Sequence, residues 1–403
     1  MSAADTAWLL VSTALVLLMT PALGFFYGGL VRAKNALNTL MMSFSAAGFV
    51  GLAWAFFGYS IAFDGGTANL FLRGIGLEAR GTIPHLLFFA YQGTFAIVTA
   101  ALISGAIVER MRFGPYLAFI TIWSLAVYAP VAHWVWGGGW LSRLGALDFA
   151  GGTVVHINAA AAALVCALVV GTRKDYARQA ILPQNVPFTL LGAGLLWLGW
   201  FGFNGGSALA ANGIAVLAFV NTMLAPAATL VVWTMLDLIR NRKATAVGAA
   251  TAIVVGLVAV TPAAGFVGPL SAIAIGALAA MPSYYALLYR ARTRLDDSLD
   301  VVAAHGVGGI VGALLTGVLA ETSWNQAGVD GSLRQLGVQA LAIVATILYS
   351  ALVTLVIVKA ISLVSRLRTD AREEGMGLDF TQHGEEAYSR GEGAILLLDR
   401  RGE

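Results

Sequence analysis

Residues 7–31 read AWLLVSTALVLLMTPALGFFYGGLV, an apolar run without a charged side chain. About 20 apolar residues suffice for a helix to cross the ~30 Å hydrocarbon core of a membrane. A secretory signal peptide is the alternative. However, the residues before the run contain Asp5 and no lysine or arginine, and the run is longer than the apolar part of such a peptide. The sequence therefore predicts a first membrane helix that is retained.

Runs of the same kind recur through almost the whole chain. Of its 403 residues, 59% are hydrophobic and 11% are charged, whereas soluble domains carry about 25% charged residues. Lipid is therefore the solvent for much of the surface, and the lengths of the runs favour helices over strands. We predict an all-α protein with eleven transmembrane helices near residues 7–31, 40–63, 84–108, 114–135, 150–170, 187–206, 213–236, 247–262, 266–289, 301–320 and 335–365.

Lysine and arginine are unevenly divided between the two sets of loops. One set holds only Arg73, Arg80, Arg143 and Arg334. The thirteen basic residues of the other set are Arg32, Lys34, Arg110, Arg112, Arg173, Lys174, Arg178, Arg240, Arg242, Lys243, Arg290, Arg292 and Arg294. Because basic residues concentrate on the cytoplasmic side, we expect the N-terminus outside and the C-terminus inside an inner or plasma membrane. Topology explains the basic loops without a nucleic-acid partner.

An internal repeat is visible in the glycine-rich ends of two helices. Residues 23–29 read LGFFYGG, and residues 198–206 read LGWFGFNGG at the end of the sixth run. Chance similarity between glycine-rich ends is the alternative. A repeat of five helices inserts its second copy upside down, and such inverted repeats build transporters with the pathway between the copies. We predict one repeat at about 7–170 and a second at about 187–320.

Two histidines, His156 and His305, lie inside predicted helices five and ten, at matching places in the repeats. An ionisable group within a membrane is a functional candidate because its desolvation must be compensated. Imidazole can relay a proton or hydrogen-bond a small polar solute. Two neutral core residues are the alternative. At ~1.5 Å per residue, each lies only ~7–9 Å deep from opposite surfaces, so the two can meet only if both helices begin inside the protein.

Residues 133–140 read HWVWGGGW and join helices four and five on the outer side. Trp136 stands beside three glycines, and an aromatic face attracts a desolvated cation by up to ~2 kcal/mol. An interfacial anchor is the alternative. Asp148 could cap the next helix or raise the cation concentration at an outer mouth. By themselves, Phe95 and Phe203 would be packing residues.

Motifs for other chemistry are absent from the sequence. It has no Walker loop and no cysteine–histidine cluster with metal-ligand spacing. Cys166, the single cysteine, lies in an apolar run and is interpreted as a buried structural residue. We therefore expect no enzyme activity, no cofactor and no metal.

Three motifs together resemble the Amt/Mep/Rh family of ammonium transporters, on the bacterial Amt side. They are residues 132–140 with 146–158, residues 199–207, and residues 300–309, within a similarity that runs from about residue 7 to 388. The resemblance implies a homotrimer with a pore for ammonium or methylammonium through each subunit. It also implies that the eleventh helix, at about 335–365, is long and peripheral.

The resemblance assigns roles to single residues. The outer recruitment site would consist of Phe95, Trp136 and Ser207, with Asp148 as the supporting acidic residue. Phe95 and Phe203 would form the stacked aromatic gate. His156 and His305 would be the paired pore histidines. Ammonium would shed its water at the recruitment site and lose its proton, because an apolar pore makes a bare charge expensive. Ammonia and the proton would then pass the histidines by separate routes. The alternatives are a passive Rh-type channel for ammonia or gas, and an ammonium sensor that signals through its tail.

Residues 1–366 would form the membrane domain and 367–403 a cytoplasmic regulatory tail. The tail residues that carry the resemblance are Asp379, His383, Gly384, Glu385 and Tyr388, while Gln382 departs from an expected acidic residue. We expect the acids of this segment, including Glu386, to pair with basic loop residues such as Arg110 and Arg173, and Tyr388 to add packing. The docked tail would keep the inner mouth competent and present a surface to a PII-type signalling protein.

Overall fold

The computed structural model describes residues 1–64 and 66–388, so residues 389–403 of the predicted tail lie outside it. The predicted all-α fold is confirmed. Within the described part of the chain, the only sheet is the hairpin of β1 (Ala79–Arg80) and β2 (Ile83–Pro84). The helices are α1 Ala3–Leu30, α2 Ala36–Ala53, α3 Tyr59–Phe63, α4 His85–Ile103, α5 Phe113–Trp123, α6 Ala129–Val135, α7 Trp140–Leu144, α8 Asn158–Val170, α9 Val186–Gly206, α10 Gly213–Asn241, α11 Ala246–Val260, α12 Pro269–Arg290, α13 Gly308–Leu319, α14 Leu333–Val364 and α15 Ala371–Met376.

Several membrane crossings combine more than one of these elements. Single π-helical turns occur at Trp54–Gly58, Ser124–Tyr128, Gly152–Ile157 and Val302–Val307, and they join or begin the longer helices. Counted this way, 10 crossings in the described chain are long and apolar enough to span a membrane. The crossing predicted at 247–262 is the shorter helix α11, which is largely buried among the others.

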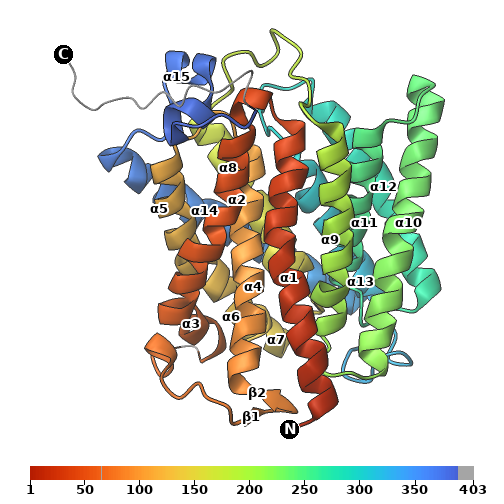
Figure 1. The fold of residues 1–403 in the computed structure, drawn as a ribbon. Helices are drawn as coiled ribbons and strands as arrows, with labels where there is room; N and C mark the ends of the chain where they lie inside the picture. The colour runs from red at the N-terminus through yellow and green to blue at the C-terminus, as the bar shows by residue number, and fades with distance from the viewer. Residues whose placement is uncertain (65, 389–403) are drawn as a thin grey trace.

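The helices stand roughly side by side, and the two ends of the bundle differ (Figure 1). The N-terminus and the β1–β2 hairpin lie at one end, which we call the hairpin face. Helix α15 lies at the other end, which we call the tail face. The last turns of the chain therefore sit on the opposite face from its start, as an odd number of crossings requires.

Helices α1 and α9, the first helix of each predicted repeat, pack along each other and run in opposite directions (Figure 1). Glycines on α9 make this close approach possible. A Cβ atom at Gly192 would collide with the backbone of Phe26, and one at Gly202 would collide with Leu15 and Ser12. The contact therefore depends on residues without side chains, in the way that small residues allow membrane helices to approach.

Helix α14 lies at the periphery of the bundle. It packs against α5, α8 and α13, while one stripe of its side chains faces outward. The exposed residues of this stripe are Leu341, Val344, Leu348, Leu352 and Val356. An outward apolar stripe on a long helix suits contact with lipid, as expected for a peripheral last helix.

Candidate functional site

The two histidines inside the membrane domain face each other. The Nδ1 atoms of His156 and His305 lie 3.2 Å apart, and both residues are buried. Each lies in a π-helical turn that begins within the protein, Gly152–Ile157 before α8 and Val302–Val307 before α13. The two helices thus start inside the protein, which allows the histidines to approach each other.

A buried aspartate stands eight residues before each histidine. The Asp148 carboxylate accepts hydrogen bonds from four main-chain N–H groups, those of Gly151, Gly152, Thr153 and Val154, at 2.7–3.0 Å. Asp297 accepts one from Val302 at 2.7 Å. Both carboxylates therefore cap the helix that carries a histidine. In the second motif, Asp297 and not Asp300 is the counterpart of Asp148.

The capping residue Asp148 also holds the tryptophan of the glycine-rich segment. The Trp136 indole N–H donates to the main-chain oxygen of Asp148 at 2.8 Å. The Trp136 ring meets Phe95 edge to face, with centroids 6.0 Å apart. Four N–H groups already occupy the Asp148 carboxylate. Asp148 therefore contributes by fixing the helix start with its carboxylate and Trp136 with its main-chain oxygen.

Two phenylalanines form a closed stack between Trp136 and the histidines. The rings of Phe95 on α4 and Phe203 on α9 are 4.2 Å apart and 24° from parallel. Phe203 in turn lies 6.1 Å from the His156 ring, again nearly parallel. Both phenylalanines are buried. The structure therefore brings Trp136, Phe95, Phe203, His156 and His305 together in this order.

Ser207 follows directly after α9, close to the stack. Its hydroxyl donates to the Phe203 carbonyl oxygen at 2.8 Å and lies 3.3 Å from the Tyr91 hydroxyl. Tyr91 is a site residue that the sequence analysis missed. Its hydroxyl is 2.9 Å from the carbonyl oxygens of Gly202 and Phe203, and its ring packs against Phe95 at 5.0 Å. Tyr91 lies one helical turn before Phe95, so helical spacing was the signal that could have found it.

Trp200 is a second residue that the sequence analysis missed. Its ring stacks on His156 with centroids 5.4 Å apart, and its indole N–H donates to the Thr261 hydroxyl at 2.9 Å. It belongs to a quoted motif and precedes Phe203 by three residues, so both lie on one helix face. Trp200 thus provides a flat, fixed wall beside the first histidine.

The histidines separate a narrow cavity from a wider one. The narrow cavity, of about 10 Å³, is bounded by both histidines, by Phe203 and by apolar side chains such as Leu23 and Val254. This volume suits about one water-sized molecule. The wider cavity, of about 350 Å³, begins at His305 and extends toward the tail face. We call it the inner cavity.

Comparisons with known proteins identify the family of this chain. A sequence model of the Ammonium Transporter Family matches residues 7–388. The chain belongs to the ammonium transporter family. It is 47% identical over 402 residues to an ammonium transporter of Bacillus subtilis, covering 96% of this chain and 99% of that one. The predicted resemblance is therefore confirmed, and the chain is a multi-pass membrane protein whose relatives are named as transporters.

Solved structures of ammonium transporter relatives share the fold. Mep2 of Candida albicans matches with a TM-score of 0.87 and 35% identity, covering 93% of this chain and 88% of that one. A protein described as a sensor Amt protein matches with a TM-score of 0.88 and 30% identity, covering 94% and 98%. Mep2 and a protein described as a sensor are thus both similar in structure to this member of the family.

The tail of this family member docks on the tail face through main-chain capping. Asp379 accepts hydrogen bonds from the N–H groups of Leu37 (3.0 Å) and Asn38 (2.7 Å). It thereby caps α2, which begins earlier than the predicted residue 40. His383 packs on Phe113 and lies 2.9 Å from the Asn38 amide. The chain then turns at Gly384, whose φ of 71° suits glycine.

The predicted charge pairing of the tail is wrong in its details. Glu385, Glu386 and Tyr388 make no ion pair or side-chain hydrogen bond within residues 1–64 and 66–388, and Tyr388 is 44% exposed. Two other tail acids meet basic loop residues: Glu373 lies 3.1 Å from Arg112, and Glu374 accepts a hydrogen bond from the Lys174 main-chain N–H. Gln382, the departure from the family pattern, accepts from the Phe113 N–H at 3.2 Å.

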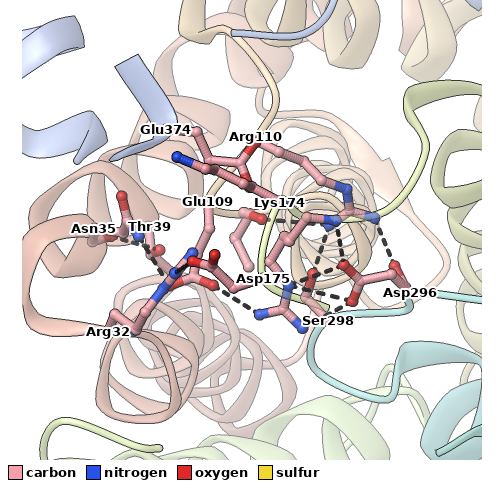
Figure 2. A network of polar contacts seen from close by, with 12 residues as sticks. Arg32, Asn35, Thr39, Glu109, Arg110, Lys174, Asp175, Asp296, Ser298 and Glu374 are labelled. Atoms are coloured by element: carbon pink, nitrogen blue, oxygen red, sulfur yellow. Dashed lines mark hydrogen bonds and ion pairs between the residues drawn. The ribbon is translucent and has the colours of Figure 1, made fainter. Parts of the chain in front are cut away.

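Arg110 and Arg173 are unavailable to those tail acids because both are buried in a polar network. Figure 2 shows Arg110 in this network with Glu109, Asp296 and Ser298. Arg173 pairs with Glu109 at 2.7 Å and with Asp296 at 2.8 Å. Arg110 donates to the Ser298 hydroxyl and to the Asp296 main-chain oxygen. Burial alone would raise the pKa of Glu109, but the guanidinium groups beside it hold that pKa below its ordinary value. The network joins residues 109 and 110, residue 173, and residues 296 and 298, which come from three separate loops.

Proposed function

We propose that this protein takes up ammonium at the hairpin face, removes its proton, and conducts ammonia past the histidine pair while the proton passes separately. The observation that carries this proposal is the continuous order Trp136, Phe95, Phe203, His156 and His305 between the hairpin face and the inner cavity. Each step from one ring to the next is a direct contact.

Recruitment would take place at Trp136, Phe95 and Ser207. The Trp136 ring is partly exposed, and its edge-to-face contact with Phe95 leaves aromatic surface for a cation. The Ser207 hydroxyl oxygen can accept a hydrogen bond from ammonium while it donates to Phe203. These groups replace part of the water shell that ammonium loses at the mouth.

Proton loss would follow from the apolar walls of the narrow cavity, which lies beyond the Phe95–Phe203 stack. An ion in an apolar, water-poor cavity loses its hydration energy, which costs several kcal/mol even after relaxation. The cavity of about 10 Å³ offers only the two imidazoles as polar partners beside its apolar walls. A neutral ammonia molecule fits this environment, and the imidazole pair can carry the proton. Methylammonium, which can also lose a proton, would follow the same route.

The hairpin face would be the outer face of an inner or plasma membrane. The basic residues Arg110, Arg173 and Arg290 all lie with the tail at the other end of the bundle, and basic residues mark the cytoplasmic side. The N-terminus is then outside and the tail inside. A docked tail in that position can present a surface to a PII-type signalling protein.

A homotrimer with one pore in each subunit would be the working assembly. The outer surfaces of α10 and α12 expose large apolar side chains, including Val231, Met235, Leu278 and Met281. Such surfaces suit either lipid or a second subunit. Because the proposed pore lies within one chain, each subunit would conduct independently.

The experiment is current recording on purified protein in planar bilayers. An inward ammonium gradient should produce a selective current that potassium does not. A passive Rh-type channel would instead move ammonia with no current. A sensor, which the similarity to the sensor Amt protein favours as a second candidate, would bind ammonium and carry little current or ammonia flux.

A further inference from the structure

The inner cavity has a carboxylate on its wall in addition to His305. Asp300 and His305 both line this cavity of about 350 Å³. They belong to one continuous segment, because the Ala304 N–H donates to the Asp300 main-chain oxygen at 2.9 Å. Neither the histidine relay nor helix capping, which Asp297 provides, uses the Asp300 side chain.

In the described part of the chain, the Asp300 carboxylate has one charged partner, Arg290. Its Oδ1 lies 2.6 Å from the Arg290 Nε, with one fifth of the side chain exposed. Neither of these two atoms makes a well-directed hydrogen bond within the described residues. Arg173 also lines the cavity, but Glu109 and Asp296 already neutralise it. Asp300 is therefore held by charge and faces the cavity.

The proposed function requires a proton acceptor in this place. If ammonia and its proton pass the histidines separately, they must reunite before ammonium enters the cytoplasm. We propose that Asp300 receives the proton from His305 and returns it to ammonia in the inner cavity. This inference rests on the proposed function and names the group that completes it.

The two steps balance in protons and charge. First, a proton moves from the His305 imidazolium, through water in the cavity, to the Asp300 carboxylate, which leaves neutral imidazole and a carboxylic acid. Then the lone pair of ammonia takes this proton, which leaves the carboxylate and ammonium. The Asp300 carboxylate then pairs again with Arg290, which leaves ammonium free to diffuse into the cytoplasm.

The acidity of Asp300 suits both steps. Burial raises the pKa of Asp300 to about 7, although Arg290 acts in the opposite direction. The neighbouring Asp297 carboxylate also raises this pKa, and Arg173 lowers it. The group can therefore be both protonated and ionised near neutral pH. As the inner pH falls through about 7, Asp300 becomes protonated and can no longer accept, so the inward current should fall.

The test uses the full-length protein in planar bilayers with the inner pH varied between about 6 and 8, on either side of the Asp300 pKa. Asp300→Asn removes the acid, and asparagine tolerates the left-handed backbone at this position (φ 59°). The double variant Arg290→Gln with Asp300→Asn also removes the arginine that the single variant leaves without its ion-pair partner. Asp175→Asn is the matched control, because Asp175 pairs with Arg32 at 2.8 Å on the same face.

We expect both Asp300 variants to carry at least about tenfold less ammonium current and to lose the dependence on inner pH, whereas Asp175→Asn keeps both. Recovery of current and pH dependence in the double variant would show that Asp300 only balances Arg290, and overturn the inference. Infrared spectra of the wild-type protein provide a readout that needs no variant, because the inference fails if no carboxyl group titrates near pH 7. An absent wild-type ammonium current would instead reject the proposed function.

Discussion

The Nδ1 atoms of His156 and His305 lie at hydrogen-bond distance, 3.2 Å, although they are the same atom of the same residue type. A neutral imidazole has one N–H, so one Nδ1 must donate and the other must accept. The two rings therefore hold opposite tautomers and share a single proton between them. Protonating both would place two cations in contact within an apolar wall, which is strongly unfavourable.

The first prediction concerns this shared proton. Replacing both histidines, His156→Leu with His305→Leu, should abolish the ammonium current, because no group then remains in the narrow cavity to carry a proton. His85→Gln is the control, since His85 contacts Glu78 and Tyr59 on the hairpin face, away from the pore. Bilayer recordings decide the matter, and an equally large and selective current in the double variant would rule out the relay.

The second prediction concerns recruitment at Trp136. Trp136→Leu should raise the ammonium concentration that half-saturates transport by up to about 30-fold, because a cation–π interaction contributes up to about 2 kcal/mol. Trp134→Leu is the control, since Trp134 packs on Trp140 and Tyr349 instead of Phe95. If the Trp136 variant keeps wild-type half-saturation and selectivity, this residue is only an interfacial anchor.

The third prediction concerns the contact between α1 and α9. Gly192→Ala should lower the free energy of unfolding by about 1–3 kcal/mol, because its new methyl group collides with the Phe26 backbone. Gly194→Ala, on the same helix, meets no atom within 4 Å and should change stability by less than about 0.5 kcal/mol. Thermal unfolding in detergent measures both, and equal midpoints would contradict the packing argument.

The fourth prediction concerns the tail. Deleting the chain after Ser365, or replacing Asp379 with alanine, should reduce transport without preventing assembly of the proposed trimer, because both remove the cap on α2. Reversing the charges of Glu385 and Glu386 should have little effect, since neither forms an ion pair within the described chain. Uptake assays with assembly checked by gel filtration test this, and full transport by the truncated protein would make the tail an inert extension.

The fifth prediction concerns acid stability. The pKa of Glu109 is lower in the folded protein than its ordinary 4.5. Its stabilising contribution is therefore complete above about pH 4.5 and is lost as the pH falls through the folded value. Glu109→Gln should cost about 1.5–3 kcal/mol at neutral pH, because Asp296 still pairs with Arg173 but the charged hydrogen bonds of Glu109 are lost, and should flatten the acid dependence. Thermal unfolding midpoints measured between pH 3 and 7 test this prediction. If the midpoint of the variant falls with pH as steeply as that of the wild type, other carboxylates cause the acid sensitivity.

The sequence predicted some residues of the candidate site and missed others. His156 and Trp136 could be named because an ionisable residue in an apolar run and a tryptophan beside three glycines stand out, whereas Phe203 was named only through the family resemblance. Tyr91 and Trp200 were missed because an aromatic residue in an apolar helix looks like packing until its neighbours are known. The tail interaction was mispredicted for a related reason, since charge counting ignores that Asp379 can satisfy main-chain N–H groups.

The sequence by itself determined that this is an all-α membrane protein, because the length and apolar character of its runs leave no other way to satisfy the backbone in lipid. It also determined the family. The resemblance also implied that His156 and His305 are paired, and the tertiary structure gave their contact distance. Only the tertiary structure decided that Asp297 corresponds to Asp148 and that Asp300 faces the inner cavity. These relationships join residues far apart in the chain, because the helices that carry them begin inside the protein. Where a helix begins depends on its packing against other helices, which a local sequence pattern does not predict.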